Sequence, residues 1–220
     1  MNLAAVLFDL DGTLADTAPD LGGALNLLLR RYDKPELPLS HSRPLVSGGA
    51  RGMLEIGFGL KPNHADFEAM KAEYLAIYEE NLCRDTHLFD GMEHVLTALE
   101  QRTIPWGIVT NKPSRFTLPL LAALNLDRRA RCIVSGDSVA RAKPHPDGLR
   151  AAAAALAMAP SSNMIYVGDD ERDIQAANAA NMTPVVARYG YLGNGNPPDK
   201  WEARHYIDSP SDLLALLAID

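Results

Sequence analysis

The chain has 220 residues, of which 47% are hydrophobic and 22% charged, a composition typical of a soluble globular protein. Acidic residues outnumber basic ones 28 to 21, and no run of Lys and Arg stands out, which argues against nucleic acid as a partner. No apolar stretch is long enough to predict a membrane span, and Asp9 interrupts the first apolar run too early for a signal peptide. Cys83 and Cys132 lie far apart and are expected to be reduced, buried thiols of a cytoplasmic protein.

The N-terminal segment predicts a buried strand. Residues 4–8 form an apolar run, and the sequence DLDGT follows it directly. A short apolar run that ends at a turn signal is typical of a strand buried in a parallel sheet. Asp9 and Asp11 would point the same way if the extended pleat continued. A plainer reading is an acidic turn, in which Gly12 supplies the bend and Thr13 caps the next helix.

The segment 17–85 changes to a helical pattern. Apolar residues recur at helical spacing from about Pro19 to Arg31 and again from about Ala65 to Asn81. A glycine-rich break, Ser47 to Gly52, lies between them, and no strand is expected between Ala15 and Asp85. The segment therefore predicts an all-helical insert that follows the first strand.

Strands and helices alternate from Phe89 onward. Strands are expected at 106–109, 132–135, 164–167 and 184–187, and helices at about 91–102, 114–124, 147–158, 172–180 and 211–219. Such alternation predicts an α/β protein with a parallel sheet and right-handed crossovers.

Polar residues follow four of the predicted strands. In chain order they are Asp9 and Asp11, Thr110 and Asn111, Lys143, and Asp169, Asp170 and Asp173. Parallel strands deliver these ends to one edge of the sheet, where ligands bind. Two like charges about 4 Å apart cost roughly 4 kcal/mol at an effective dielectric near 20, so the acids predict a bound cation, a proton or both. Taken singly, the groups have plainer explanations: an acidic turn, a helix cap and a solvated loop lysine.

Together these residue types suit phosphoryl transfer. An aspartate can attack phosphorus, and a second acid can protonate the leaving alkoxide and then deprotonate water. Carboxylate oxygens favour Mg²⁺, which would also relieve the repulsion between carboxylate and phosphate. Lys143 and the hydroxyl of Thr110 would hold the phosphoryl oxygens.

With all four groups present in this order, the chain resembles the haloacid dehalogenase superfamily of phosphatases over its whole length. The resemblance implies a Rossmann-like core formed by residues 1–16 and 86–220. It also implies that the insert, residues 17–85, is a helical cap that closes over the substrate. A phosphosugar mutase of the same superfamily and a non-catalytic phosphate-binding module are the alternatives.

The resemblance also implies roles for individual residues. Asp9 would be the nucleophile and Asp11 the general acid and base. Thr110 and Lys143 would bind the phosphoryl group, and Asn111 is expected to contact the substrate.

The expected cofactor is Mg²⁺. Its ligands would be Asp9, Asp169 and the backbone carbonyl of Asp11, with Asp173 acting through water. Asp170 stands where many relatives have serine, and the sequence assigns it no role.

Three further segments, SGGAR, LFDGM and RYGY, resemble the phosphoglycolate phosphatase-like subgroup. This likeness implies that the partner is a small phosphorylated carboxylate or sugar, either phosphoglycolate or N-acetylmuramic acid 6-phosphate, a metabolite of cell-wall recycling. Arg51 on the glycine-rich segment is expected to meet the substrate's carboxylate; otherwise it is a solvated surface arginine.

Overall fold

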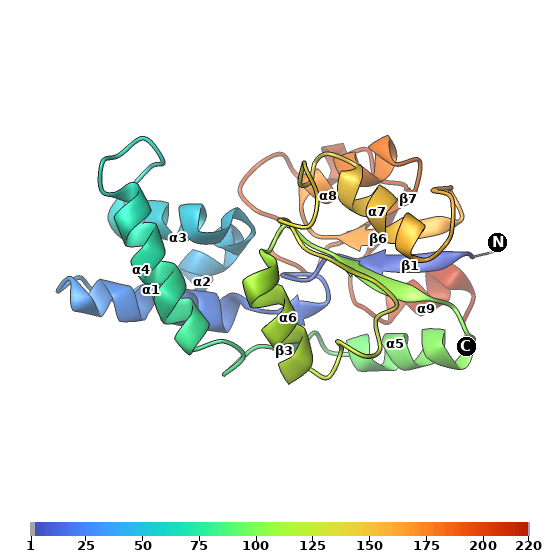
Figure 1. Cartoon of the computed structure of the whole chain (residues 1–220), viewed down its shortest axis with the longest axis horizontal. Helices are drawn as coiled ribbons and strands as arrows, with labels where there is room; N and C mark the ends of the chain where they lie inside the picture. The colour runs from blue at the N-terminus through green and yellow to red at the C-terminus, as the bar shows by residue number, and fades with distance from the viewer. Residues whose placement is uncertain (1–2, 220) are drawn as a thin grey trace.

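The computed structural model describes residues 3–219, so residues 1–2 and 220 of the predicted core lie outside the described part. Within it, the chain forms a Rossmann-like parallel sheet of six strands, covered by helices, and a second sheet of two strands (Figure 1). The larger sheet has the order β5-β4-β1-β6-β7-β8. Its strands are β1 (Ala5–Phe8), β4 (Trp106–Val109), β5 (Ile133–Val134), β6 (Met164–Gly168), β7 (Thr183–Ala187) and β8 (His205–Ile207).

Both faces of β1 are buried. Val6 and Phe8 belong to one hydrophobic cluster, whereas Ala5 and Leu7 belong to another, as the two-residue period of a strand requires. The core helices that supply these clusters and flank the sheet are α5 (Met92–Gln101), α6 (Ser114–Ala123), α7 (Asp147–Ala155), α8 (Glu171–Ala179) and α9 (Asp212–Leu217). The continuous apolar run is therefore explained by burial on two sides.

The helical insert has a hydrophobic cluster of its own. Its elements are α1 (Ala18–Arg31), α2 (Leu39–Ser42), the 3₁₀ helix η1 (Arg43–Gly48), α3 (Gly49–Phe58) and α4 (Phe67–Glu80). Leu25, Met53 and Tyr74 are fully buried in this cluster, and Phe116 and Tyr191 of the core join it. Figure 1 shows the insert at the end of the molecule toward which β1 points. The insert thus lies beyond the carboxyl ends of the strands.

Both connections between the sheet and the helical insert pass through the small sheet. β2 (Ala15–Asp16) pairs antiparallel with β3 (His87–Leu88). Asp20 of α1 strengthens this junction, because its carboxylate accepts hydrogen bonds from the backbone N–H groups of residues 84–86 and from the Thr86 hydroxyl. The entering and leaving segments are therefore held together.

Several elements differ from the sequence predictions. The prediction of no strand between Ala15 and Asp85 is wrong at its start, where β2 covers Ala15 and Asp16. Two residues are too few to show the alternating hydrophobic pattern of a strand. The glycine-rich segment 47–52 is not a loop: α3 begins at Gly49, where φ is +58°, so the break is a junction between two helices. β8 was not predicted, since only one of its residues is fully buried.

No described helix has the length and apolar character needed to cross a membrane. Both cysteines are free thiols. Cys132 is buried as expected, and burial raises its pKa to about 11. Cys83 is only half-buried, contrary to the prediction, because it lies on the segment that returns to the sheet.

Candidate active site

The chain turns immediately after Asp9. The backbone N–H groups of Leu14 and Ala15 donate to the carbonyl of Leu10 at 3.1 and 2.9 Å, so the pleat does not continue to Asp11. Gly12 has φ +85°, and a Cβ there would lie 2.2 Å from Oδ2 of Asp169. The turn therefore needs a glycine for both conformation and space.

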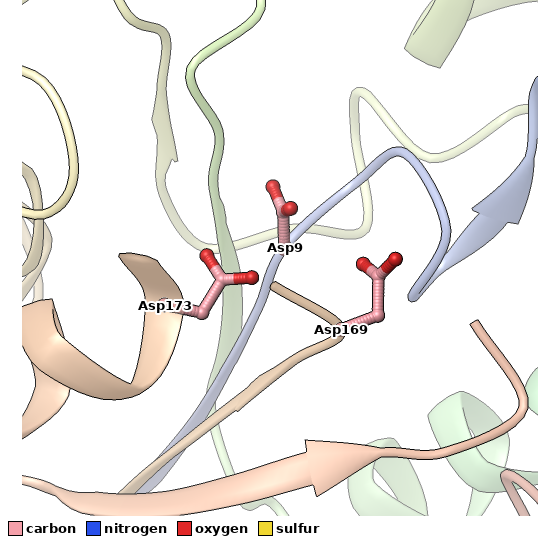
Figure 2. Close-up of side chains that lie close together, drawn as sticks. All are labelled: Asp9, Asp169 and Asp173. Atoms are coloured by element: carbon pink, nitrogen blue, oxygen red, sulfur yellow. The ribbon is translucent and has the colours of Figure 1, made fainter. Parts of the chain in front are cut away.

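Three buried carboxylates meet at the carboxyl ends of β1 and β6. Asp9 follows β1, Asp169 follows β6 and Asp173 lies on α8, and Figure 2 shows their side chains next to one another. One oxygen from each lies within 4.8 Å of the others. Asp169 is fixed by two donors, the Thr13 hydroxyl at 2.8 Å and the backbone N–H of Tyr191 at 2.9 Å.

The electrostatics of this cluster favour a cation. Burial raises the pKa of Asp9 to about 7; Lys143 opposes the rise and Asp173 adds to it. Burial and the nearby charge of Asp9 also raise the pKa of Asp169 well above its ordinary value. A divalent cation would replace the protons that these groups otherwise retain. Hard carboxylate oxygens in this arrangement fit Mg²⁺.

Lys143 lies between two of the carboxylates. Its Nζ is 2.8 Å from Asp9 and 2.7 Å from Asp173, and it also donates to the hydroxyl of Tyr166 at 2.8 Å. Although burial lowers the pKa of Lys143, the charges of Asp173 and Asp9 raise it above its ordinary value. The side-chain amide of Asn111 hydrogen-bonds the backbone N–H and carbonyl of Lys143 at 2.9 and 3.0 Å, so the lysine is held from both ends.

Asp11 has different partners from Asp9. Its Oδ1 accepts from Nζ of Lys112 at 2.9 Å and from the Thr17 hydroxyl at 2.6 Å. The ammonium of Lys112 also lies 4.8 Å from the centre of the Tyr78 ring, a residue of the helical insert. Asp11 is thus oriented by one donor from the core and one from the start of the insert.

A cavity of about 540 Å³ lies between the sheet edge and the helical insert. The predicted site residues that line it are Asp9, Asp11, Arg51, Thr110, Asn111, Lys143 and Asp173. On the insert side its walls are largely apolar, with Leu21, Phe67, Tyr74, Leu75 and Tyr78, together with Phe116 of the core. Arg51 lies on α3 and is exposed toward solvent as well as lining the cavity.

The predicted residues are thus brought together, although their individual roles stay predictions. The carboxylate of Asp11 is outside the three-acid cluster, and the expected use of its backbone carbonyl stays a prediction. Asp169 belongs to the cluster but is too deep to line the cavity. The amide of Asn111 binds the backbone of Lys143, so its side chain supports the lysine in this structure.

Sequence reasoning missed two residues of the site, Lys112 and Arg172, and it did not foresee that Tyr191 of the RYGY segment holds Asp169. Lys112 directly follows Thr110 and Asn111, and this adjacency was a usable signal. Arg172 and Tyr191 act on residues more than 120 positions away, so only the folded chain reveals them.

The site can be compared with known proteins. The sequence profile of the haloacid dehalogenase-like hydrolases matches residues 6–187. The chain belongs to that family. It is an enzyme of the phosphatase type, since its curated relatives are named phosphatases over nearly their whole length.

Among these relatives, the chain is 37% identical to the N-acetylmuramic acid 6-phosphate phosphatase of Pseudomonas aeruginosa, over 99% of this chain and 96% of the relative. It is 42% identical to the phosphoglycolate phosphatase of Xanthomonas campestris pv. campestris, over 95% and 94% of the two chains. The crystal structure of a predicted phosphoglycolate phosphatase from Haemophilus somnus superposes with a TM-score of 0.86, at 25% identity and over 99% of both chains.

Proposed function

We propose that this haloacid dehalogenase-like phosphatase hydrolyses a small phosphomonoester through an aspartyl phosphate formed on Asp9. The observation that carries the proposal is the position of Asp9: it lies at the carboxyl end of β1, lines the cavity and is 2.8 Å from the ammonium of Lys143. A carboxylate at the floor of a cavity, beside a fixed positive charge, suits attack on a phosphorus atom.

In the first step an oxygen of Asp9 attacks phosphorus and the bond to the leaving-group oxygen breaks. Asp11 gives a proton to that oxygen, so the product leaves as an alcohol. In the second step Asp11 takes a proton from water, which attacks the phosphorus of the aspartyl phosphate and releases inorganic phosphate. Lys112 and Thr17 orient Asp11 for both transfers. Thr110 and Lys143 hold the phosphoryl oxygens.

Asp9, Asp169 and Asp173 are the residues that would hold Mg²⁺, with the backbone carbonyl of Asp11. When bound there, the cation offsets the negative charge that carboxylate and phosphate bring together. Within the chain itself, the hydrogen bonds from Thr13 and Tyr191 keep Asp169 in place for this task.

The helical insert, residues 17–85, is proposed to act as the cap that selects the leaving group. The cavity has a volume of about 540 Å³, within the range of roughly 300–1,000 Å³ that is usual for pockets binding drug-sized ligands. Its apolar walls and the cationic side chain of Arg51 favour a sugar phosphate with a carboxylate, whereas Lys71 is paired with Glu68 of the same wall. N-acetylmuramic acid 6-phosphate therefore suits the cavity better than phosphoglycolate, because its sugar ring and acyl group offer surface to the apolar wall that phosphoglycolate lacks.

The test is a comparison of kcat/KM on these two esters and on p-nitrophenyl phosphate, with Mg²⁺ and with EDTA. Asp9→Asn should abolish turnover of all three, because loss of the nucleophile costs several orders of magnitude. Asp208→Asn, an exposed acid outside the site, is the matched control. Near-normal activity of a folded Asp9→Asn protein would refute the mechanism, and a requirement for a bisphosphate activator would indicate a mutase instead.

A further inference from the structure

Arg172 connects the core to the helical insert. Its Nη2 donates to the backbone carbonyl of Ser47 at 2.7 Å, across 125 positions of the chain. Arg172 lies in the first turn of α8, whereas Ser47 lies near the end of η1, in the glycine-rich junction that precedes Arg51. The contact therefore ties this junction to the carboxyl end of the sheet.

Asp170 holds the guanidinium of Arg172 in one orientation. Its Oδ1 accepts from Nε at 2.7 Å and its Oδ2 accepts from Nη2 at 2.9 Å. Oδ1 also accepts the backbone N–H of Arg172, as a helix cap does. Because two parallel hydrogen bonds fix the plane of a guanidinium, Arg172 cannot turn away without breaking this pair.

The same helix turn reaches the phosphoryl site. The backbone N–H of Asp170 donates to Oδ2 of Asp173 at 3.0 Å, and Oδ1 of Asp173 pairs with Lys143 at 2.7 Å. Lys143 in turn pairs with Asp9. Within this one helix turn, Asp170 orients Arg172, which contacts the insert at Ser47. Asp173 of the same turn supports Lys143 beside Asp9.

The contact of Arg172 with Ser47 and Asp170, called the bridge below, lies between two cavities. Ser47, Arg51, Asp170 and Arg172 line the active-site cavity and also a second one of about 340 Å³, which the loop 192–196 borders on its far side. Asp170 and Arg172 therefore stand where the two spaces meet.

We propose that Arg172, oriented by Asp170, is a specificity-determining positioning residue for the cap. Arg172 fixes the position of Ser47, and with it the segment of the insert that carries Arg51, so that Arg51 contacts the leaving group. The inference rests on the proposed function. A substrate whose leaving group reaches this segment depends on the bridge, whereas a generic aryl phosphate depends on it much less.

The experiment compares Arg172→Ala and Arg172→Lys with Arg150→Ala. Arg150 is the matched control, because it also donates to a backbone carbonyl, that of Ala179 at 3.2 Å, but within the core. Hydrogen exchange of the backbone amides of residues 45–52 is measured without substrate. It should accelerate about tenfold in Arg172→Ala, the effect of losing one charged hydrogen bond, and should not change in Arg150→Ala.

The second readout is the ratio of kcat/KM on N-acetylmuramic acid 6-phosphate to kcat/KM on p-nitrophenyl phosphate. This ratio should fall about tenfold to a hundredfold in Arg172→Ala and recover in part in Arg172→Lys. Asp170→Asn keeps a side chain that caps the helix but removes the ion pair with Arg172. It should therefore cause a smaller acceleration of amide exchange and a smaller fall in the kcat/KM ratio.

An unchanged ratio, or unchanged amide exchange, in Arg172→Ala would overturn the proposal. Equal losses on both esters would also overturn it, because Arg172 would then act on the phosphoryl group or the fold. If the wild-type enzyme hydrolyses no carboxylated ester, the proposed substrate fails, and the exchange measurement alone decides whether Arg172 holds the junction.

Discussion

The backbone N–H of Tyr191 donates to Oδ2 of Asp169 at 2.9 Å. The hydroxyl of the same tyrosine accepts from the backbone N–H groups of Thr17 and Ala18 at 2.8 and 2.9 Å and donates to Asp16 at 3.0 Å. A candidate metal ligand and the first turn of the helical insert are therefore held by the two ends of one residue.

Tyr191→Phe should lower the free energy of unfolding by about 1–3 kcal/mol. The substitution leaves the backbone N–H of Thr17 buried without its acceptor, and it leaves that of Ala18 only a longer hydrogen bond to Asp16 at 3.3 Å. Urea unfolding measures the change. Tyr206→Phe is the control, since that hydroxyl is part-buried and makes a single long hydrogen bond of 3.4 Å. An equal decrease in the free energy of unfolding in the two variants would contradict the prediction, because the hydroxyl of Tyr191 would then stabilise the fold no more than that of Tyr206.

Mg²⁺ should raise the melting temperature. Binding to the folded state alone at a concentration near 100 times Kd stabilises by about 2.7 kcal/mol, which corresponds to about 5–10 °C for a chain of this size. Asp169→Ala should remove most of this shift, because it deletes one of the three clustered carboxylates. Asp208→Ala, at an exposed acid, should keep the shift. An undiminished shift in Asp169→Ala would place the cation elsewhere.

The stability of the metal-free protein should fall as pH rises. Burial raises the pKa of Asp9 from 3.8 to about 7, so between these values the folded state binds more protons than the unfolded state. The free energy of unfolding therefore decreases with pH across this window, and the raised pKa of Asp169 acts in the same direction.

Thermal unfolding in EDTA and in Mg²⁺, at about pH 5 and about pH 7.5, tests this sign. The increase in melting temperature caused by Mg²⁺ should be larger at the higher pH. There the carboxylates are ionised and the cation relieves their repulsion, whereas at the lower pH it must displace bound protons. In Asp9→Asn the decline with pH should be smaller. A gain that is the same at both pH values would contradict the prediction.

Arg51→Ala should lower kcat/KM on a carboxylated substrate by about tenfold to a hundredfold, the loss of a charge-assisted contact worth roughly 1.5–3 kcal/mol. Hydrolysis of p-nitrophenyl phosphate, which has no carboxylate, should change little. Arg30→Ala removes an exposed arginine of the same insert that does not line the cavity and is the matched control. Equal losses on both substrates would assign Arg51 to the fold or the phosphoryl group, and no loss on either would leave it a solvated arginine.

Much of the sheet, and the meeting of the candidate phosphoryl-site residues at one edge of it, could be predicted because both follow from local signals. The apolar runs that became β1, β4 and β6 are buried on both faces, and parallel pairing alone brings Asp9, Thr110 and Asp169 to one edge. No knowledge of side-chain packing was needed for that step.

The rest depends on contacts that no window of sequence contains. The strand β2 exists only because residues 87–88 return to pair with it. The helix α3 was hidden by glycines, of which Gly52 lies against the carbonyl of Leu45, where a Cβ would stand 2.5 Å away. Arg172 has the pattern of an ordinary surface helix cation until the cap places Ser47 beside it.

The pairing of β2 with β3 has a consequence for how the enzyme can open. Two independent flexible linkers would let the cap swivel and tilt in any direction. Here the entering and leaving segments are neighbours in one ladder, and Asp20 binds the second segment to the first helix of the cap. We therefore expect motion of the proposed cap to be mainly a rotation about an axis near this ladder, which would bring the insert back to the same position over Asp9.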